Sequence, residues 1–156
     1  MRTTSELGAE PRGPGYSDLL YRAFPWCAAL SFVVPALAAG EPLLRSGQVV
    51  LRELEPYLVS ATDETEWPGT HLDGGATARV YRYRLHPEVL DVVAGATDHL
   101  YGWRPPQLPQ DIALYHADGT PFLATVTQEE WAALTIDEAE RAALADLDLE
   151  LRPLWA

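Results

Sequence analysis

The sequence predicts an α+β fold: a small, mostly antiparallel sheet that contains an Asp-Gly hairpin and has its helices packed on one face. Residues 77–85 alternate with the period of two that a strand requires. Residues 112–126 do so on both sides of Asp118-Gly119, a pair favoured in hairpin turns because both positions tolerate positive φ. Other segments repeat their apolar residues with the period of an α-helix. We therefore expect strands and helices in separate segments of the chain.

The length of the chain, 156 residues, is typical of one domain. Residues 1–15 are rich in Gly, Pro, Thr and Glu without periodicity, so we expect a flexible tail there. Residues 16–156 are expected to form a single α+β domain, long enough to bury a core without disulfides. The lone cysteine, Cys27, rules out a disulfide within the chain and is expected to pack as a small hydrophobic residue.

The balance of charge limits the classes of partner. The chain has 11 basic residues, all of them Arg, and 23 acidic residues, so its net charge is −12. Nucleic acid is not expected as a partner, because binding to phosphates depends on Lys and Arg side chains that release counterions. Anionic membranes are disfavoured for the same reason. A basic protein would be attracted and would associate faster at low salt.

Residues 24–39, FPWCAALSFVVPALAA, form the most apolar run of the chain. The run is shorter than the roughly 20 residues that a membrane span requires, and two prolines interrupt it. The acidic segment that precedes it is unlike the short basic start of a signal peptide. We therefore interpret it as one or two buried elements of the core, and we expect the protein to be cytoplasmic.

Two helices are predicted in the first half of the chain. Asp18 is a suitable cap for a short helix that ends or kinks at Pro25. Ser46 is a suitable cap for a second helix, whose apolar residues recur on one face. Because Pro56 does not fit inside a continuous helix, we expect this second helix to kink or to stop at Glu55.

Two further helices are predicted in the second half. His86-Pro87 fits the start of a helix, with proline at the first helical position. Thr135 and Glu138 have the spacing of a capping box for the final helix. The segment 148–156 alternates enough to dock as an edge strand after that helix.

Residues 60–75, SATDETEWPGTHLDGG, are predicted to form a polar loop that combines acids with an aromatic residue. It fits three interpretations: a solvated loop, a metal site and a protein-contact loop. The spacing of Asp63, His71 and Asp73 matches no established metal pattern, so we predict no metal. An exposed Trp67 among carboxylates would be a good anchor for a basic protein. The candidate contact residues, from this loop and from the acidic stretch after the hairpin, are Asp63, Glu64, Glu66, Trp67, His71, Asp73, Glu129, Glu130 and Trp131.

Arg79, Arg82 and Arg84 form the one basic cluster in the sequence. The simplest expectation is that they pair with some of the surplus carboxylates. The alternative is a site for an anionic ligand, because the guanidinium fork suits phosphates and carboxylates. In that alternative, Arg82, Arg84 and His71 line the pocket of a small enzyme or ligand-binding domain.

The segment LPQDIALYHADGTPFLATVTQEEWAALT runs from a proline-led entry through a strand, a turn and a second strand to an acidic pair and an aromatic residue. Residues 128–134 within it fit either a helix or a third strand, and we favour the strand. The segment resembles small acidic domains common in actinobacteria, some of which lie beside secreted toxins as immunity proteins. The resemblance covers roughly the last half of the chain, from Arg79 onward. It implies a fold and protein binding, and it transfers no functional residues.

Signatures of catalysis are missing from the sequence. It has no glycine-rich phosphate loop, no Gly-x-Ser-x-Gly elbow and no His-Glu-x-x-His motif. Asp98 and His99 are adjacent, and because neighbours on a helix point about 100° apart we expect them to act as separate surface residues. We predict no catalytic residues and no cofactor. The leading hypothesis is a protein-binding module, such as an immunity or antitoxin-type inhibitor; a scaffold or accessory subunit, possible as a homodimer, is a further alternative.

Overall fold

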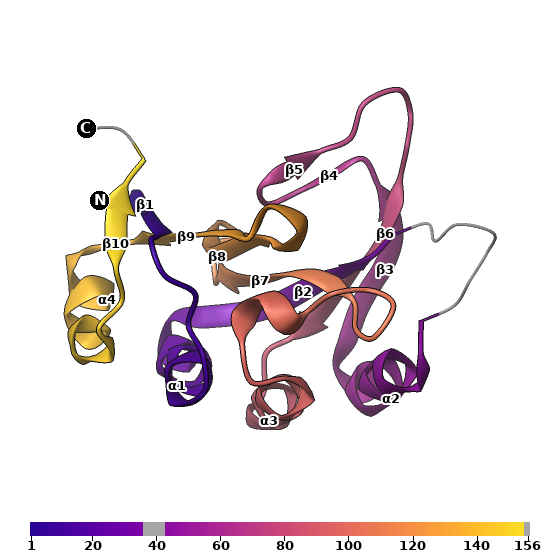
Figure 1. Ribbon diagram of the computed structural model, residues 1–156, viewed down its shortest axis with the longest axis horizontal. Coiled ribbons are helices and arrows are strands. Elements are labelled where there is room, and N and C mark those ends of the chain that lie inside the picture. The colour runs from indigo at the N-terminus through magenta and orange to yellow at the C-terminus, as the bar shows by residue number, and fades with distance from the viewer. Residues whose placement is uncertain (36–42, 155–156) are drawn as a thin grey trace.

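Eight strands form one antiparallel sheet, and the four α-helices of the described residues lie on the same face of it (Figure 1). The structure is a computed structural model that describes residues 1–35 and 43–154. The strands are β1 (Thr3–Leu7), β2 (Cys27–Val34), β3 (Leu58–Glu64), β6 (Ala78–Arg84), β7 (Gln110–His116), β8 (Pro121–Val126), β9 (Trp131–Ile136) and β10 (Leu151–Pro153). Their order across the sheet is β10-β1-β9-β8-β7-β2-β6-β3. A separate two-stranded hairpin consists of β4 (Glu66–Trp67) and β5 (Thr70–His71).

The helices cover the sheet from below in the view of Figure 1. They are α1 (Pro14–Ala23), α2 (Arg45–Leu54), α3 (Pro87–Ala96) and the short α4 (Glu138–Ala143). Short 3-10 helices lie at Phe24–Trp26, Glu55–Tyr57, Leu100–Gly102, Thr127–Glu129 and Ala145–Leu147. The predicted fold class is confirmed, although the sheet is larger than expected because the sequence analysis did not identify β1, β2 and β3 as strands.

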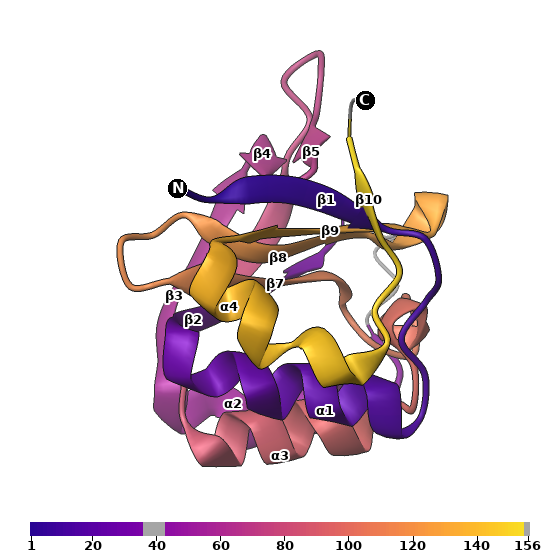
Figure 2. The ribbon, with the colours of Figure 1, turned by 90° about the vertical axis from the view of Figure 1, so that its left-hand side faces the viewer.

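The N-terminal segment is not a flexible tail. Within it, β1 pairs with β9 on one side and with β10 on the other, as Figure 2 shows. Ser5 and Leu7 are buried by this pairing. Helix α1 also begins inside the expected tail, at Pro14, four residues before the predicted cap Asp18. The prediction failed because the strand partners of β1 lie more than 120 residues away in the sequence.

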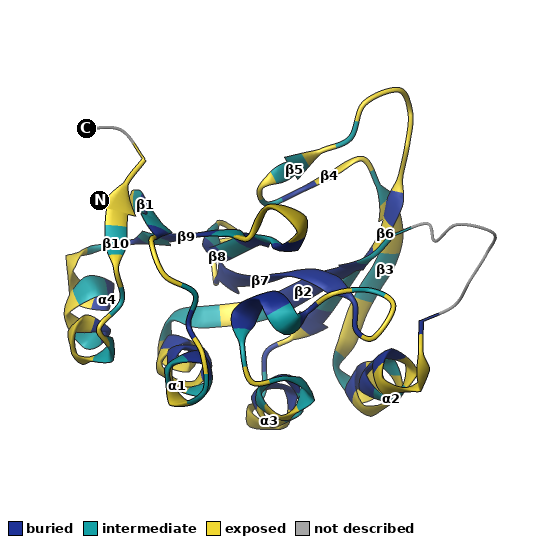
Figure 3. Cartoon of the chain, viewed as in Figure 1, coloured by how far each residue is buried: buried dark blue, intermediate teal, exposed yellow. Residues whose placement is uncertain are grey.

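The apolar run supplies the centre of the sheet, as β2 between β6 and β7. Leu30, Phe32 and Val33 are fully buried there, and Figure 3 shows β7 beside them buried along its length. The prediction of a buried element is confirmed for residues 30–33, whereas Phe24, Pro25 and Ala28 of the same run are exposed, and residues 36–39 lie outside the described residues. No helix in the described part of the chain is long and apolar enough to cross a membrane.

The core lies between the sheet and the helix layer, and Trp103 is its largest fully buried side chain. Its indole Nε1 donates to the Tyr16 hydroxyl at 2.9 Å, and this hydroxyl donates to the Val93 carbonyl at 2.6 Å. These two bonds satisfy the polar atoms of Trp103 and Tyr16 inside the core, as buried polar groups require. They also connect α1 to α3 and to the segment that enters β7.

The helix boundaries follow the local signals in part. Helix α2 ends at Leu54, one residue before the predicted stop. His86 caps α3 by accepting from the Glu88 backbone N–H at 3.1 Å, as predicted. Ser46 is not a cap, because α2 begins at Arg45 and the Ser46 hydroxyl donates to the Gln107 carbonyl instead.

The capping box of α4 is displaced by two residues from its predicted position. Asp137 and Glu140 form it: each side chain accepts a hydrogen bond from the other's backbone N–H, at 2.8 and 2.9 Å. Thr135, the predicted cap, belongs to β9, which continues through Ile136. Strand pairing with β1 therefore decides where the helix can begin.

The Asp-Gly hairpin joins β7 to β8 through the four residues 117–120. His116 N donates to Thr120 O at 2.8 Å, and Gly119 N donates to His116 O at 2.9 Å. Gly119 has a φ of 88°, whereas Asp118 keeps a negative φ, so the predicted two-residue turn is wrong. Asp118 instead closes the turn, and its hydrogen bonds from Thr120 and Arg2 hold the pKa of its carboxyl well below the usual range.

Candidate functional site

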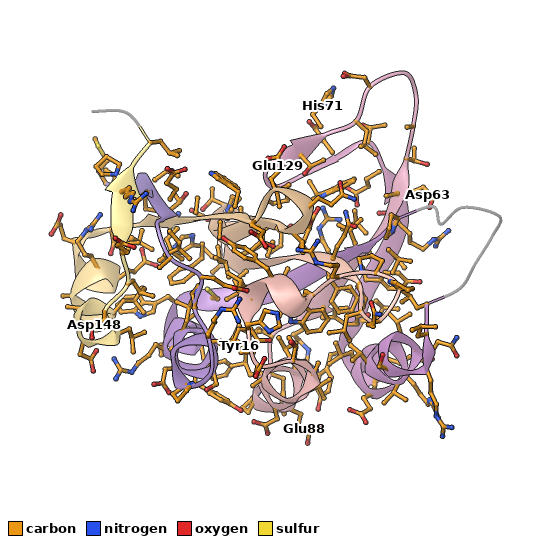
Figure 4. All side chains as sticks on the ribbon, in the orientation of Figure 1. Tyr16, Asp63, His71, Glu88, Glu129 and Asp148 are labelled. Carbon is orange, nitrogen blue, oxygen red and sulfur yellow. The ribbon has the colours of Figure 1, made fainter. Side chains whose placement is uncertain are left out.

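A pocket of about 500 Å³ lies between the β4–β5 hairpin and the sheet, on the face without helices. The Thr127–Glu129 turn closes one side of it. Figure 4 shows His71 and Glu129 on this face, above the sheet in the same view as Figure 1. The lining residues are Pro35, Trp67, Gly69, Thr70, His71, Leu72, Ala76, Thr77, Ala78, Gln110, Asp111, Val126, Gln128 and Glu129.

Trp67 attaches the β4–β5 hairpin, which covers the pocket, to the sheet. A two-stranded hairpin alone is marginally stable in water, so this one needs a tertiary anchor. The Trp67 side chain packs with Val33, Ala78 and Val80 in a small second core, and its indole Nε1 donates to Asp111 Oδ2 at 2.9 Å. Gly69, with a φ of 88°, allows the close approach, because a Cβ there would lie 2.8 Å from a methyl carbon of Val126.

Asp111 is the buried polar centre of the site. Its side chain is 3% exposed, and it also accepts from the Thr127 backbone N–H at 2.8 Å and from the Gln110 amide at 3.3 Å. Its backbone has a φ of 58°, a left-handed conformation that Asp tolerates better than most residues. A non-glycine residue is kept in such a conformation only where its surroundings hold it, and here three hydrogen bonds do so. Asp111 thus fastens β7 to the hairpin and to the turn after β8.

The electrostatics of the pocket favour a cation. Asp111 and Glu129 contribute carboxylates to the lining, and no Arg lines the pocket among the described residues. At the rim, His71 Nδ1 lies 3.4 Å from Glu66 Oε2, and its Nε2 lies 3.9 Å from Asp73 Oδ1. The exposed acids Glu66 and Asp73 therefore lie beside His71, and the exposed Glu129 lines the same pocket as the buried Asp111.

The structure brings together part of the predicted contact set. Trp67 and His71 from one acidic stretch and Glu129 from the other line the same pocket, although about 60 residues separate them in sequence. Glu66 and Asp73 are not lining residues, but each has a carboxylate oxygen near a ring nitrogen of His71, which does line the pocket. The sequence did not predict that the stretches around His71 and Glu129 lie close together, because this depends on the packing of the β4–β5 hairpin against the end of β8.

Trp67 is not the exposed anchor that the sequence analysis expected, since its side chain is 8% exposed. The predicted loop is also mostly regular structure: β3 occupies its first part and the β4–β5 hairpin the next. Trp131 is half-buried, and its indole Nε1 donates to Glu6 Oε2 at 3.0 Å, while Glu130 adopts a left-handed φ of 50°. Neither tryptophan is therefore an exposed anchor.

The remaining predicted acids pair with the basic cluster. Arg79 Nε lies 3.3 Å from Asp63 Oδ1, and Arg82 forms two hydrogen bonds to Glu64, at 2.6 and 3.2 Å. The bond from Arg82 holds the pKa of Glu64 below its usual value. Arg84 lies over the Tyr57 ring, 5.4 Å from its centroid. The expected internal pairing is therefore present for Arg79 and Arg82.

The alternative pocket of Arg82, Arg84 and His71 does not form. His71 lines the pocket under the hairpin, whereas Arg82 and Arg84 are not among its lining residues. Arg82 already has a carboxylate partner, and Arg84 is over Tyr57 near the start of α3. These three side chains do not converge on one ligand.

Two histidine–carboxylate pairs were missed in the sequence. His99 Nδ1 lies 2.8 Å from Asp98 Oδ1, because α3 ends at Ala96, so that Asp98 lies in a bend and His99 in extended backbone, not on a helix. His116 Nε2 lies 2.7 Å from Glu140 Oε2, with both side chains almost fully buried. The second pair connects the β7–β8 hairpin to α4. In the described residues, no three His, Cys, Asp or Glu side chains are grouped so that they could hold a metal ion.

Cys27 lies half-buried opposite His116, at the start of β2. Burial raises the pKa of its thiol to about 12, and Glu140 adds to the rise. We expect Cys27 to react with a disulfide reagent at pH 8 on the order of a hundredfold more slowly in the folded protein than in urea, because little thiolate forms. Absorbance of the released thiolate measures both rates. Equal rates in the two states would contradict this account of Cys27.

We compared the chain with protein-family models, with curated proteins and with solved structures, and found no match in any of the three. The functional argument therefore depends on the pocket and on the charge of the chain.

Proposed function

We propose that this chain is a cytoplasmic, non-catalytic binding module for a basic protein, of the immunity or antitoxin-inhibitor kind. The observation that carries the proposal is the pocket under the β4–β5 hairpin, whose lining in the described part of the chain includes Asp111 and Glu129 and no arginine, while Glu66 and Asp73 lie beside its lining residue His71. The binding site consists of this pocket and its rim acids Glu66, Asp73 and Glu129, and is called the acidic pocket below.

A single Arg or Lys side chain of the partner fits the chemistry of the acidic pocket. Its volume of about 500 Å³ leaves room for a long side chain, and Glu129 at the turn and Asp111 in the wall favour a positive head group. Arg is one of the residue types enriched among those that dominate binding energy at protein interfaces. Paired acids at a rim also accelerate association, which makes the interaction sensitive to salt.

The first experiment is affinity purification of the tagged protein from its native host at low ionic strength. We expect one basic protein to co-elute in stoichiometric amount and to be released as the salt concentration rises. If none co-elutes at any salt concentration, the proposal fails. A gene for a secreted toxin next to the gene for this chain would support the inhibitor interpretation and would identify the partner to test.

The acidic pocket is then tested by removing two of its charges. We expect the double variant Glu66→Gln, Glu129→Gln to weaken partner binding at least tenfold at low salt, mainly through slower association, because exposed charges steer the encounter. Surface plasmon resonance at several salt concentrations measures both rate constants. Both side chains are exposed, so the fold should be unaffected.

The matched control is Glu53→Gln, Glu55→Gln, which removes two exposed charges from the helix side of the molecule. We expect it to change the affinity less than twofold. Equal effects of the two double variants would mean that net charge alone attracts the partner, and the assignment to the acidic pocket would be wrong.

A further inference from the structure

The two edges of the sheet differ in how well they are protected. Strand β10 has three residues and includes Pro153, and both features discourage pairing with another chain. Strand β3 has seven residues and no proline, and it pairs with β6 along one side alone among the described residues, with a β-bulge between Leu58 and Ser60. One carbonyl of β3, that of Ala61, accepts a hydrogen bond from Arg79 at 3.2 Å. Strand β3 is therefore the longer and less protected edge.

The edge also begins with exposed apolar side chains. Leu58 is 40% exposed and Val59 is 69% exposed. They are the one adjacent pair among the large exposed hydrophobic residues in the described part of the chain. Such a pair next to unpaired backbone groups favours the addition of a further strand over exposure to water.

The charge near β3 differs from that of the whole chain. The net charge is −12, so two copies repel each other at long range. At this edge, however, Arg79 pairs with Asp63 and Arg82 with Glu64, and Arg84 lies on the next strand. Each of the two β3 carboxylates is therefore paired with a guanidinium group, and Arg84 lies over Tyr57, whose hydroxyl donates to Glu88. A second acidic copy meets less repulsion here than over the acidic pocket.

We propose that β3 pairs antiparallel with β3 of a second copy, so that a twofold symmetric dimer extends the sheet. A contact of a strand with itself is self-complementary, as a twofold dimer requires. If the axis lies at Ser60, Val59 lies opposite Ala61 and Leu58 opposite Thr62 of the second copy. In this register Asp63 and Glu64 fall beyond the five paired residues, so like charges do not face each other.

The dimer is tested by sedimentation equilibrium of the full chain. We expect the wild-type protein to sediment at twice the mass of the chain at about 100 μM, and Val59→Lys to sediment as a monomer. Lysine on an edge strand opposes pairing, and Val59 is exposed enough for the fold to accept the change. Leu154→Lys, an equivalent change at an exposed position after β10, is the control and should dimerise like the wild type.

Salt dependence separates this contact from the proposed partner binding. Raising the ionic strength from about 10 mM to about 150 mM shortens the Debye length from about 30 Å to about 8 Å. Because two chains of the same sign repel less at higher salt, the dimer should become tighter, whereas binding of a basic partner should weaken. The Glu66→Gln, Glu129→Gln variant should still dimerise, so loss of partner binding and loss of the dimer are distinguishable.

Two results would overturn the inference. A monomer at both ionic strengths at about 1 mM would show that β3 does not pair with itself at any useful concentration. A dimer that Val59→Lys and Leu154→Lys leave equally intact would place the contact on another surface.

Discussion

Replacing Glu140 with alanine should lower the free energy of unfolding by about 2–5 kcal/mol, because two donors, His116 Nε2 and Asp137 N, lose their acceptor at about 1–3 kcal/mol each. Glu140 Oε2 accepts from His116 Nε2 at 2.7 Å, and Oε1 accepts from the Asp137 backbone N–H at 2.9 Å. The side chains of His116 and Glu140 are 3% and 2% exposed, so water cannot replace the lost acceptors without opening the structure. Urea denaturation followed by tryptophan fluorescence measures the change.

Two comparison variants separate the buried pair from the helix cap. Asp137→Ala removes the side-chain cap of α4 and should cost about 1 kcal/mol. Glu140→Gln keeps one acceptor oxygen, which can serve either His116 Nε2 or the Asp137 N–H, and should cost less than Glu140→Ala. If Glu140→Ala is no more destabilising than Asp137→Ala, the buried pair does not stabilise the fold and the explanation is wrong.

Replacing Asp111 with alanine should destabilise the protein by about 3–5 kcal/mol, because two buried donors, Trp67 Nε1 and Thr127 N, lose their acceptor at about 1–3 kcal/mol each. Alanine must also adopt a φ of 58°, which costs a further 1–2 kcal/mol or so. The loss should be concentrated in the hairpin: hydrogen exchange of the Trp67 indole N–H should accelerate more than that of the β7 amides. Urea denaturation with exchange measured by NMR tests both statements.

Substitution by asparagine and by glycine divides the effect into its parts. Asp111→Asn tolerates the left-handed backbone and keeps one acceptor, so it should be the mildest of the three. Asp111→Gly removes the backbone strain but also the acceptors, so it should be less destabilising than Asp111→Ala by about 1 kcal/mol. Equal stability of Asp111→Ala and the wild type would show that Asp111 does not hold the hairpin.

The Asp111 variants also bear on the acidic pocket. Asp111 holds both walls, because it binds Trp67 under the hairpin and Thr127 at the start of the turn that carries Glu129. Loosening of both walls should reduce partner binding even though the rim acids are unchanged. The effect of Asp111→Ala on binding is therefore structural, in contrast to that of Glu66→Gln, Glu129→Gln, which changes charge alone.

Local signals in the sequence predicted the elements that depend on near neighbours. The alternation of β6 and of the β7–β8 hairpin was recognisable because a strand with two different faces has a period of two. The cap of α3 at His86 and the end of α2 before Pro56 follow from steric rules that act over a few residues. The third strand of the meander, β9, was favoured correctly over a helix.

The candidate site was predicted in part. The acidic stretches around His71 and Glu129 were identified as candidates from composition alone, but their convergence on one pocket was not. Trp67 was misjudged because a tryptophan among carboxylates has the same local pattern whether it is exposed or covered. The buried acceptor Asp111 that decides its burial lies 44 residues away.

The sequence by itself determined the acidic character, which follows from composition, and the fold class. It also determined the positions of several strands and helix ends, since these depend on residues that are near neighbours in the sequence. The tertiary structure alone decided that β1 is an inner strand, that Trp67 is buried and that His116 pairs with Glu140. The physical reason is the same in each case. The group that satisfies the hydrogen bonds or covers the apolar surface comes from a distant segment, and no local pattern of residues records that partner.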